Sequence, residues 1–162
     1  MEMDFRKTLL TMCCCLAFVS ASAQVKVFKG NSTYSSDVIC TLRDGKVYKG
    51  NSSYTSDVLC RIDDNKVYRG NSSYSSDILY TVRNGKVYKG SSSYSSDVLF
   101  NIKDGKLYDG NSSYSSDVFA NKQGLKVYKN NSNYSSDVDF TLSGDVTIEQ
   151  FVAIWYAVKY CW

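Results

Sequence analysis

Histidine and proline are both absent from the 162 residues of the chain. Histidine is the commonest general base and the commonest zinc ligand, so its absence excludes histidine-based catalytic triads and most zinc hydrolase sites. Any catalysis would have to use Asp, Lys, Tyr or Cys side chains. The sequence therefore predicts a protein that is not an enzyme and that carries neither a metal nor a cofactor.

The chain also lacks a strong excess of charge and a membrane-length apolar run. Its 19 Lys and Arg residues against 16 Asp and Glu residues give a net charge of +3, and such mild basicity argues against nucleic-acid binding. The apolar run from Leu9 to Val19 is shorter than the roughly 20 residues that a transmembrane helix needs.

That run has the features of a secretory signal peptide over residues 1–23. Arg6 and Lys7 precede the run, and Ala21-Ser22-Ala23 follows it as an A-x-A cleavage site. We therefore expect export to the periplasm, the cell surface or the extracellular space. Lipidation at one of the cysteines 13–15 is an alternative, although small residues typical of such a site do not precede them.

The dominant feature of the rest of the chain is a repeat of 20 residues, present six times. Each unit approximates KVYKGNSSYSSDVLxTVxDG. One invariant column consists of Tyr34, Tyr54, Tyr74, Tyr94, Tyr114 and Tyr134, and another of Asp37, Asp57, Asp77, Asp97, Asp117 and Asp137. A repeat architecture is therefore the first expectation.

Each unit predicts two antiparallel strands. The segment 86–89 is short, β-branched and aromatic, and the segment 97–102 alternates in hydrophobicity. Pairs such as Asp44-Gly45, Asp64-Asn65, Asn84-Gly85 and Asp104-Gly105 tolerate the positive φ of type I′ hairpin turns. Wider Gly-Asn-Ser-Ser-Tyr-Ser-Ser turns link the two strands of one unit. Residues 24–144 thus predict an all-β domain of twelve strands.

Alternation predicts which residues face inward. The expected core columns are Val38, Val58, Ile78, Val98, Val118, Val138 and, on the same face, Leu42, Ile62, Val82, Ile102, Leu142. The opposite face would carry an outer apolar belt of Ile39, Leu59, Leu79, Leu99 and Phe119, broken at Asp139. Repeat five, with Ala120, Lys122 and the segment 123–125, predicts a bulge or a distorted edge.

Residues 145–162 predict one helix. Thr147 and Gln150 form a capping box, and Phe151 to Trp162 is apolar on nearly every side. Such a helix must be surrounded by protein or lipid. Twelve strands closed into a barrel leave a lumen that wall side chains do not fill. We therefore expect a closed antiparallel barrel plugged by the helix, with a β-solenoid capped by the helix as the alternative.

Three cysteines remain after the signal segment, so at least one thiol is unpaired in a monomer. Cys40 and Cys60 occupy equivalent strands separated by one strand, roughly 9–10 Å apart, which is beyond disulfide reach. If the helix fills the barrel, Cys161 could form a disulfide with Cys40 or Cys60.

The hairpin Gly45-Lys46-Val47-Tyr48-Lys49-Gly50 resembles the repeated GKxYxG hairpins of the four-fold beta-flower proteins of gut Bacteroidota. Twelve strands around a hydrophobic C-terminal helix are also similar to the tubby-like barrel, whose members include phosphoinositide-binding proteins and lipid scramblases. This second resemblance is architectural and implies a lipid partner. No phosphoinositide-contact motif of that family matches a stretch of this chain.

Three repeated columns are candidate sites. A basic rim for anionic lipid, glycan or phosphate would consist of Lys26, Lys46, Lys66, Lys86, Lys106 and Lys126, which could equally be solvated strand-edge lysines. An aromatic surface would consist of Tyr48, Tyr68, Tyr88, Tyr108 and Tyr128, which could equally be half-buried wall residues. The aspartate of each Tyr-Ser-Ser-Asp segment fits a local turn better than Ca²⁺, which needs several oxygens.

The function expected from these features is that of an exported, non-catalytic structural or binding protein of the cell envelope. Its partner would be a glycan, a protein or another copy of the chain. The alternative is a peripheral binder of anionic lipid. An enzyme would need an irregular repeat, and only Asn121 and Lys122 in repeat five offer unlike polar groups.

Overall fold

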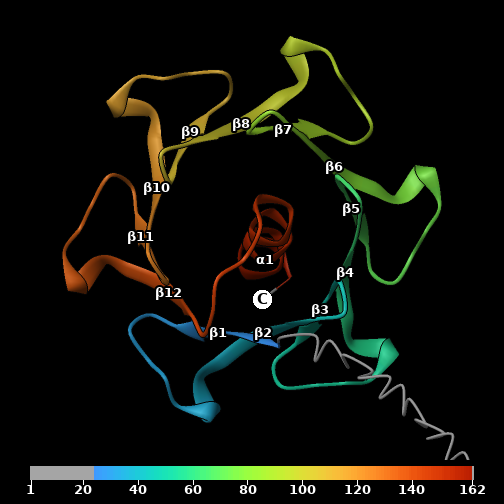
Figure 1. The fold of residues 1–162 in the computed structure, drawn as a ribbon, viewed down its shortest axis with the longest axis vertical. Helices are drawn as coiled ribbons and strands as arrows, with labels where there is room; N and C mark the ends of the chain where they lie inside the picture. The colour runs from blue at the N-terminus through green and yellow to red at the C-terminus, as the bar shows by residue number, and fades with distance from the viewer. Residues whose placement is uncertain (1–23, 162) are drawn as a thin grey trace, which may run out of the picture.

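The computed structural model describes residues 24–161, and the predicted signal peptide at residues 1–23 lies outside them. Twelve strands form one closed antiparallel barrel in chain order (Figure 1). They are β1 Val25–Lys29, β2 Val38–Arg43, β3 Lys46–Lys49, β4 Val58–Asp63, β5 Lys66–Arg69, β6 Ile78–Arg83, β7 Lys86–Lys89, β8 Val98–Lys103, β9 Lys106–Asp109, β10 Val118–Gln123, β11 Lys126–Lys129 and β12 Val138–Leu142.

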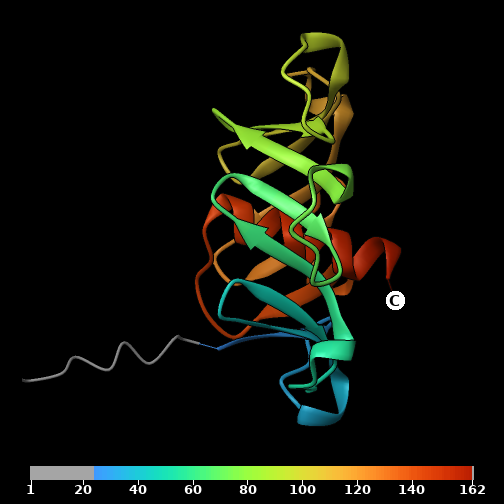
Figure 2. The same cartoon turned by 90° about the vertical axis from the view of Figure 1, so that its right-hand side faces the viewer.

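The barrel closes where β1 pairs with β12, with Val27 opposite Leu142 and Lys29 opposite Phe140. The alternative of a capped solenoid is therefore wrong. One end of the barrel carries the tight turns between repeats, and the other carries six wide loops (Figure 2). Each loop contains a short 3₁₀ helix, in order Ser35–Asp37, Thr55–Asp57, Ser75–Asp77, Ser95–Asp97, Ser115–Asp117 and Ser135–Asp137.

The tight turns depend on residues that accept positive φ. Asn84 and Gly85 have φ of 51° and 73°, as a type I′ turn requires. A Cβ on Gly85 would lie 2.8 Å from the carbonyl oxygen of Ile102. In repeat five Gly124 supplies the positive φ at the first turn position, with φ of 56°. Strands β10 and β11 therefore pair in the same register as the other hairpins. Strand β10 does contain a bulge between Val118 and Ala120, but every repeat has the same bulge, so the expectation that repeat five is distorted relative to the others is wrong.

A β-bulge near the start of the longer strand occurs in every repeat. In the first repeat Phe28 lies opposite Val38 and Val27 lies opposite Cys40, so Ile39 is the extra residue. A bulge reverses the alternation of side chains before and after it. Val38 and Leu42 therefore point to opposite sides of the wall.

Because of the bulge, two of the predicted side-chain orientations are wrong. The column that begins with Val38 points to the outer face of the barrel and not to the lumen. On that outer face Val38 lies opposite Phe28, and Val58 lies opposite Tyr48. The predicted outer belt beginning with Ile39 instead faces the lumen: Ile39 belongs to the core, and the ring of Phe119 lies 5.4 Å from that of Trp155. Counting by twos through the bulge produced both errors.

Helix α1, Ile148–Tyr160, lies inside the barrel (Figures 1 and 2), as the sequence predicts. Thr147 caps it: the Thr147 side chain accepts from the Gln150 amide, and the Gln150 side chain accepts from the Thr147 amide at 3.0 Å. Six helix residues are buried, namely Phe151, Val152, Ala153, Ile154, Trp155 and Ala157. No helix in the described residues is long and apolar enough to cross a membrane.

The helix packs most closely against β2 to β5. Cys40 and Cys60 supply small side chains on that wall, and the Cys60 thiol donates to the Ala153 carbonyl at 3.4 Å. Of the equivalent residues farther round the barrel, Tyr80, Phe100 and Phe140 are larger, and Ala120 is smaller. Phe140 lies 6.2 Å from Trp155 between ring centroids. Large side chains at this repeated position thus fill the space between the helix and the strands β6 and β12.

Candidate functional site

The six wide loops share one hydrogen-bond network. In the first loop the Ser32 hydroxyl donates to Asp37 at 2.5 Å, and the Tyr34 amide donates to the same hydroxyl at 3.1 Å. The Asp37 amide donates to the Tyr34 carbonyl at 3.0 Å. The same bonds recur in the other five loops. The aspartate column therefore holds the loops, as the turn interpretation predicts.

Hydrogen bonds also join the first loop to each of its two neighbours. The Asn51 side-chain amide donates to the Ser35 carbonyl of the preceding loop at 3.0 Å. The Asn31 side-chain amide donates to the Ser135 carbonyl across the β1–β12 closure at 2.5 Å. In the fifth loop the Ser112 and Ser116 hydroxyls hold the pKa of the Asp117 carboxyl below its ordinary value. These bonds order the loop end of the barrel.

The invariant tyrosines of these loops are the most exposed large hydrophobic side chains in the described residues. Tyr34, Tyr54, Tyr74, Tyr94 and Tyr114 are each 74% exposed, and Tyr134 is 72% exposed. Their backbone is fixed by the shared network, while their rings extend into solvent. The protein thus presents six equivalent aromatic side chains around one end.

The wall tyrosines predicted as an aromatic surface are placed differently. Tyr48 and Tyr68 are buried, while Tyr88, Tyr108 and Tyr128 are half-buried on the outer wall. Arginine side chains cover three of the rings: Arg43 over Tyr48 at 4.9 Å, Arg61 over Tyr68 at 5.5 Å and Arg83 over Tyr88 at 5.4 Å. The structure therefore places this column in the wall, in agreement with the second interpretation of the sequence.

The lysine column that begins with Lys26 lies on the same outer wall, toward the tight turns. Lys46, for example, pairs with Arg43 on one side and with Arg61 on the other. Lys26, Lys46, Lys66, Lys86 and Lys106 are half-buried, and Lys126 is exposed. This column surrounds the barrel wall and does not line its mouth.

A second basic column, which the sequence interpretation did not single out, lines the mouth at the loop end. It consists of Lys29, Lys49, Arg69, Lys89 and Lys129, with Asp109 at the sixth position. All six are exposed and lie on the lumen side of the wall, because Lys49 follows the inward Val47 by two residues. Each of these residues directly precedes the first residue of a wide loop, which is glycine in five repeats and Asn130 in the sixth. This repeated position is the sequence signal that could have identified them.

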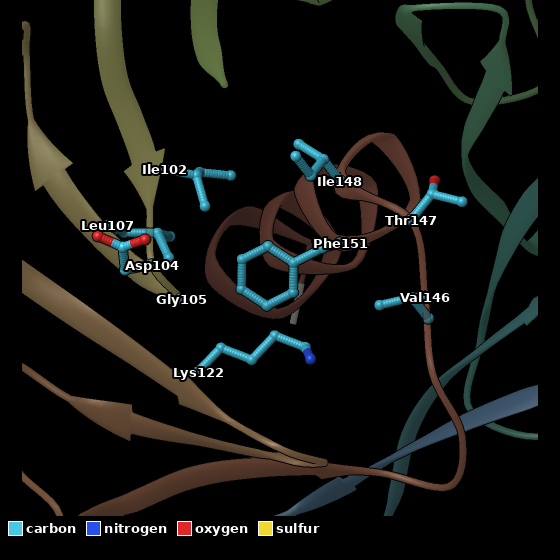
Figure 3. A pocket seen from close by; sticks show the side chains of 9 residues that line it. All are labelled: Ile102, Asp104, Gly105, Leu107, Lys122, Val146, Thr147, Ile148 and Phe151. Carbon is cyan, nitrogen blue, oxygen red and sulfur yellow. The ribbon is translucent and has the colours of Figure 1, made fainter. Parts of the chain in front are cut away.

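The off-centre helix leaves a cavity at each end of the barrel. The first, near the helix N-terminus and the tight turns, has a volume of about 240 Å³ (Figure 3). Ile102, Leu107, Ile148 and Phe151 give it an apolar lining, and Lys122 enters it from β10 (Figure 3). The Lys122 ammonium donates to the Gly124 carbonyl at 2.8 Å. The irregular lysine of repeat five thus lines the lumen mouth.

The second cavity, at the loop end, has a volume of about 580 Å³. It lies between the last turns of α1 and the wall formed by β6 and β8 to β10. Its lining is Tyr80, Leu99, Phe100, Asp109, Phe119, Trp155, Lys159 and Tyr160. Burial raises the pKa of the Tyr80 phenol, and the nearby Tyr160 and Tyr156 add to the shift, so the Tyr80 hydroxyl stays protonated at neutral pH.

All three cysteines of the described chain are free thiols. Burial raises the pKa of Cys40 to about 12 and that of Cys60 in the same direction, and Cys161 adds to both shifts. A disulfide from Cys161 to Cys40 or Cys60 stays a prediction, which intact mass without reductant tests. The described residues contain no group of three or more His, Cys, Asp or Glu side chains that could hold a metal ion.

The fold and its six equivalent loops define a closed repeat barrel built around a central helix. The chain belongs to the 6-fold beta flower protein family, whose model matches residues 26–155. The sequence resemblance to beta-flower hairpins is thereby confirmed, with six-fold in place of four-fold repetition. No curated protein matches the chain in sequence. An X-ray structure of a protein from Arabidopsis thaliana is similar with a TM-score of 0.47 and 14% identity, over 85% of this chain and 90% of that chain.

Proposed function

We propose that the chain is an exported, non-catalytic binding protein of the cell envelope that holds an extended ligand through several equivalent loops. The observation that carries the proposal is the set of six loop tyrosines, which share one backbone geometry and are 72–74% exposed. Six weak equivalent contacts to a repeating ligand act together and raise its apparent affinity far above that of one contact.

The second basic column supports an anionic glycan as the ligand. Five cations line the same end of the barrel as the exposed tyrosines, and none of them forms one of the ion pairs found in residues 24–161. Tyrosine rings stack on sugar faces, and cations attract carboxylate or phosphate groups along a polymer. Near-identity of the repeats supports the absence of catalysis, because an active site needs unlike polar groups at one place.

Co-sedimentation of the chain from residue 24 onward with purified peptidoglycan sacculi tests this proposal. Tyrosine is replaced by alanine in one, three alternate or all six loops, and Ser73→Ala serves as the matched loop control. We expect a small loss of binding with one replacement, a loss of about tenfold or more with three, and no binding with six. Wild-type sedimentation of the six-fold variant, folded by circular dichroism, would contradict the proposal.

A peripheral anionic-lipid binder is the second candidate, and the cationic column at the mouth is the observation that favours it. Flotation with phosphatidylcholine vesicles, with and without phosphatidylglycerol, tests it. A lipid binder would require the anionic lipid and would lose binding as salt rises. Binding that ignores both lipid charge and salt would count against this function.

A further inference from the structure

The loop-end cavity has an aromatic lining that none of the repeated columns provides by itself. Tyr80 and Phe100 come from the wall position that holds Cys40 and Cys60 elsewhere, and Phe119 is a bulge residue. The helix adds Trp155 and Tyr160. At about 580 Å³ the cavity is large enough for a small organic molecule.

Asp109, at the edge of this cavity, reverses the charge of its column. The equivalent residues in the other five repeats are Lys29, Lys49, Arg69, Lys89 and Lys129. Asp109 is exposed, and it takes part in none of the ion pairs of residues 24–161. In a chain whose repeats are otherwise so alike, the one acidic residue of the column lies where the aromatic cavity opens.

The other charges at the cavity leave Asp109 uncompensated. Lys159 is bound by Asp139, and its ammonium lies 4.8 Å from the centroid of the Trp155 ring, so this cation already has both a counter-ion and an aromatic partner. The C-terminal end of α1 adds partial negative charge. Lys89 and Lys129 lie on β7 and β11, each two strands from β9, which is roughly 9–10 Å. Salt screens such distances between exposed groups.

We propose that the loop-end cavity binds a small organic cation with an apolar or aromatic body. The ammonium group lies beside the Asp109 carboxylate, and the body lies among Phe100, Phe119 and Tyr160. Cations are attracted both to a carboxylate and to aromatic faces, whereas a carboxylate ligand would be repelled by Asp109. This site goes beyond the proposed function, because it uses the lumen wall and not the exposed loop tyrosines.

Three small molecules that share a 2-phenylethyl group and differ in charge test the site. The probes are 2-phenylethylammonium, 2-phenylethanol and 3-phenylpropionate, titrated into the chain from residue 24 onward and followed by calorimetry and by the Trp155 indole NMR signal. We expect the ammonium probe to bind most tightly and the carboxylate most weakly. Asp109→Asn should weaken the ammonium probe about tenfold, and Asp109→Lys should reverse the order of the two charged probes.

Asp109→Lys restores the residue type that four sibling repeats carry, so the variant keeps a side chain compatible with the fold. Lys129→Asp is the matched control, because it changes a charge of the same column away from the cavity; we expect less than a twofold effect on the ammonium probe. Equal affinities of all three probes, no saturable binding of the ammonium probe, or an Asp109→Lys variant that binds it unchanged would each overturn the proposal. None of these results depends on binding by the loops.

Discussion

Lys159, in the last turn of α1, forms an ion pair with Asp139, the bulge residue of β12. Asp139 is the only polar residue in a column that is otherwise Ile39, Leu59, Leu79, Leu99 and Phe119. The pair therefore connects the helix to the wall at the loop end, close to the ring of Trp155.

Removing Lys159 should destabilise the barrel, because the Asp139 side chain is only 15% exposed and would lose its counter-ion. We expect Lys159→Met to lower the free energy of unfolding by about 1–2 kcal/mol in urea titrations. Asp139→Ile combined with Lys159→Met should recover most of the loss, because Ile39 holds the same position in the first repeat. A double variant as unstable as the single one would contradict a role for the pair.

Stability should fall at alkaline pH because of the buried thiols. The pKa of Cys40 is raised from 9.0 to about 12, and that of Cys60 is also raised, so the folded state holds more protons than the unfolded state above pH 9. The contribution of the two thiols to the free energy of unfolding should be constant up to about pH 9 and then fall by about 1.4 kcal/mol per pH unit for each thiol. The Cys40→Ala, Cys60→Ala double variant should show a shallower decline; an unchanged slope would contradict this cause.

The loop network predicts a local effect of Asp77→Ala. Without the Asp77 carboxylate, the Ser72 hydroxyl loses its acceptor and no longer holds the Tyr74 amide in place. We expect hydrogen exchange of the Tyr74 amide to become about tenfold faster, with strand amides unchanged. Ser73→Ala is the control, and equal exchange in the two variants would show that the carboxylate does not order the loop.

Two glycine positions should respond differently to substitution. Gly85 has φ of 73°, and its Cβ would approach Ile102 O at 2.8 Å, so Gly85→Ala should cost about 1–3 kcal/mol of stability. Gly110→Asn should be nearly neutral, since a Cβ there meets nothing within 4 Å and Asn130 adopts φ of 53° at the equivalent position. Thermal unfolding measures both, and a stable Gly85→Ala variant would contradict the role of the turn.

The sequence predicts the repeat unit, the twelve strands and the terminal helix, because each depends on local patterns such as Asn84-Gly85 or the Thr147 capping box. Closure joins the first and last strands, and it is predicted from the need to surround the apolar helix and not from a local pattern. The direction of side chains at the start of each longer strand could not be predicted the same way. The bulge at Ile39 is a property of the pairing between β1 and β2, in which Phe28 lies opposite Val38, and the alternation within β2 alone does not show it.

The candidate sites illustrate the same limit. The loop tyrosines and the aspartate column follow from the repeat, but the cation column that begins with Lys29 becomes a mouth lining only once the barrel closes. The cavity beside Asp109 lies between α1 and the wall, so it depends on tertiary packing that no single repeat encodes. A residue that departs from the repeat, such as Asp109, indicates where one unit differs from the others.

The helix inside the barrel limits how many repeat units the protein can contain. Near-identical repeats are prone to gain or lose a unit, and each unit here adds two strands to the circumference. Because barrel diameter grows with strand number, a seventh unit would widen the space between α1 and the strands opposite Cys60, and the loss of one unit would narrow the lumen around Trp155. The terminal helix therefore fits a barrel of six units better than a barrel of five or seven.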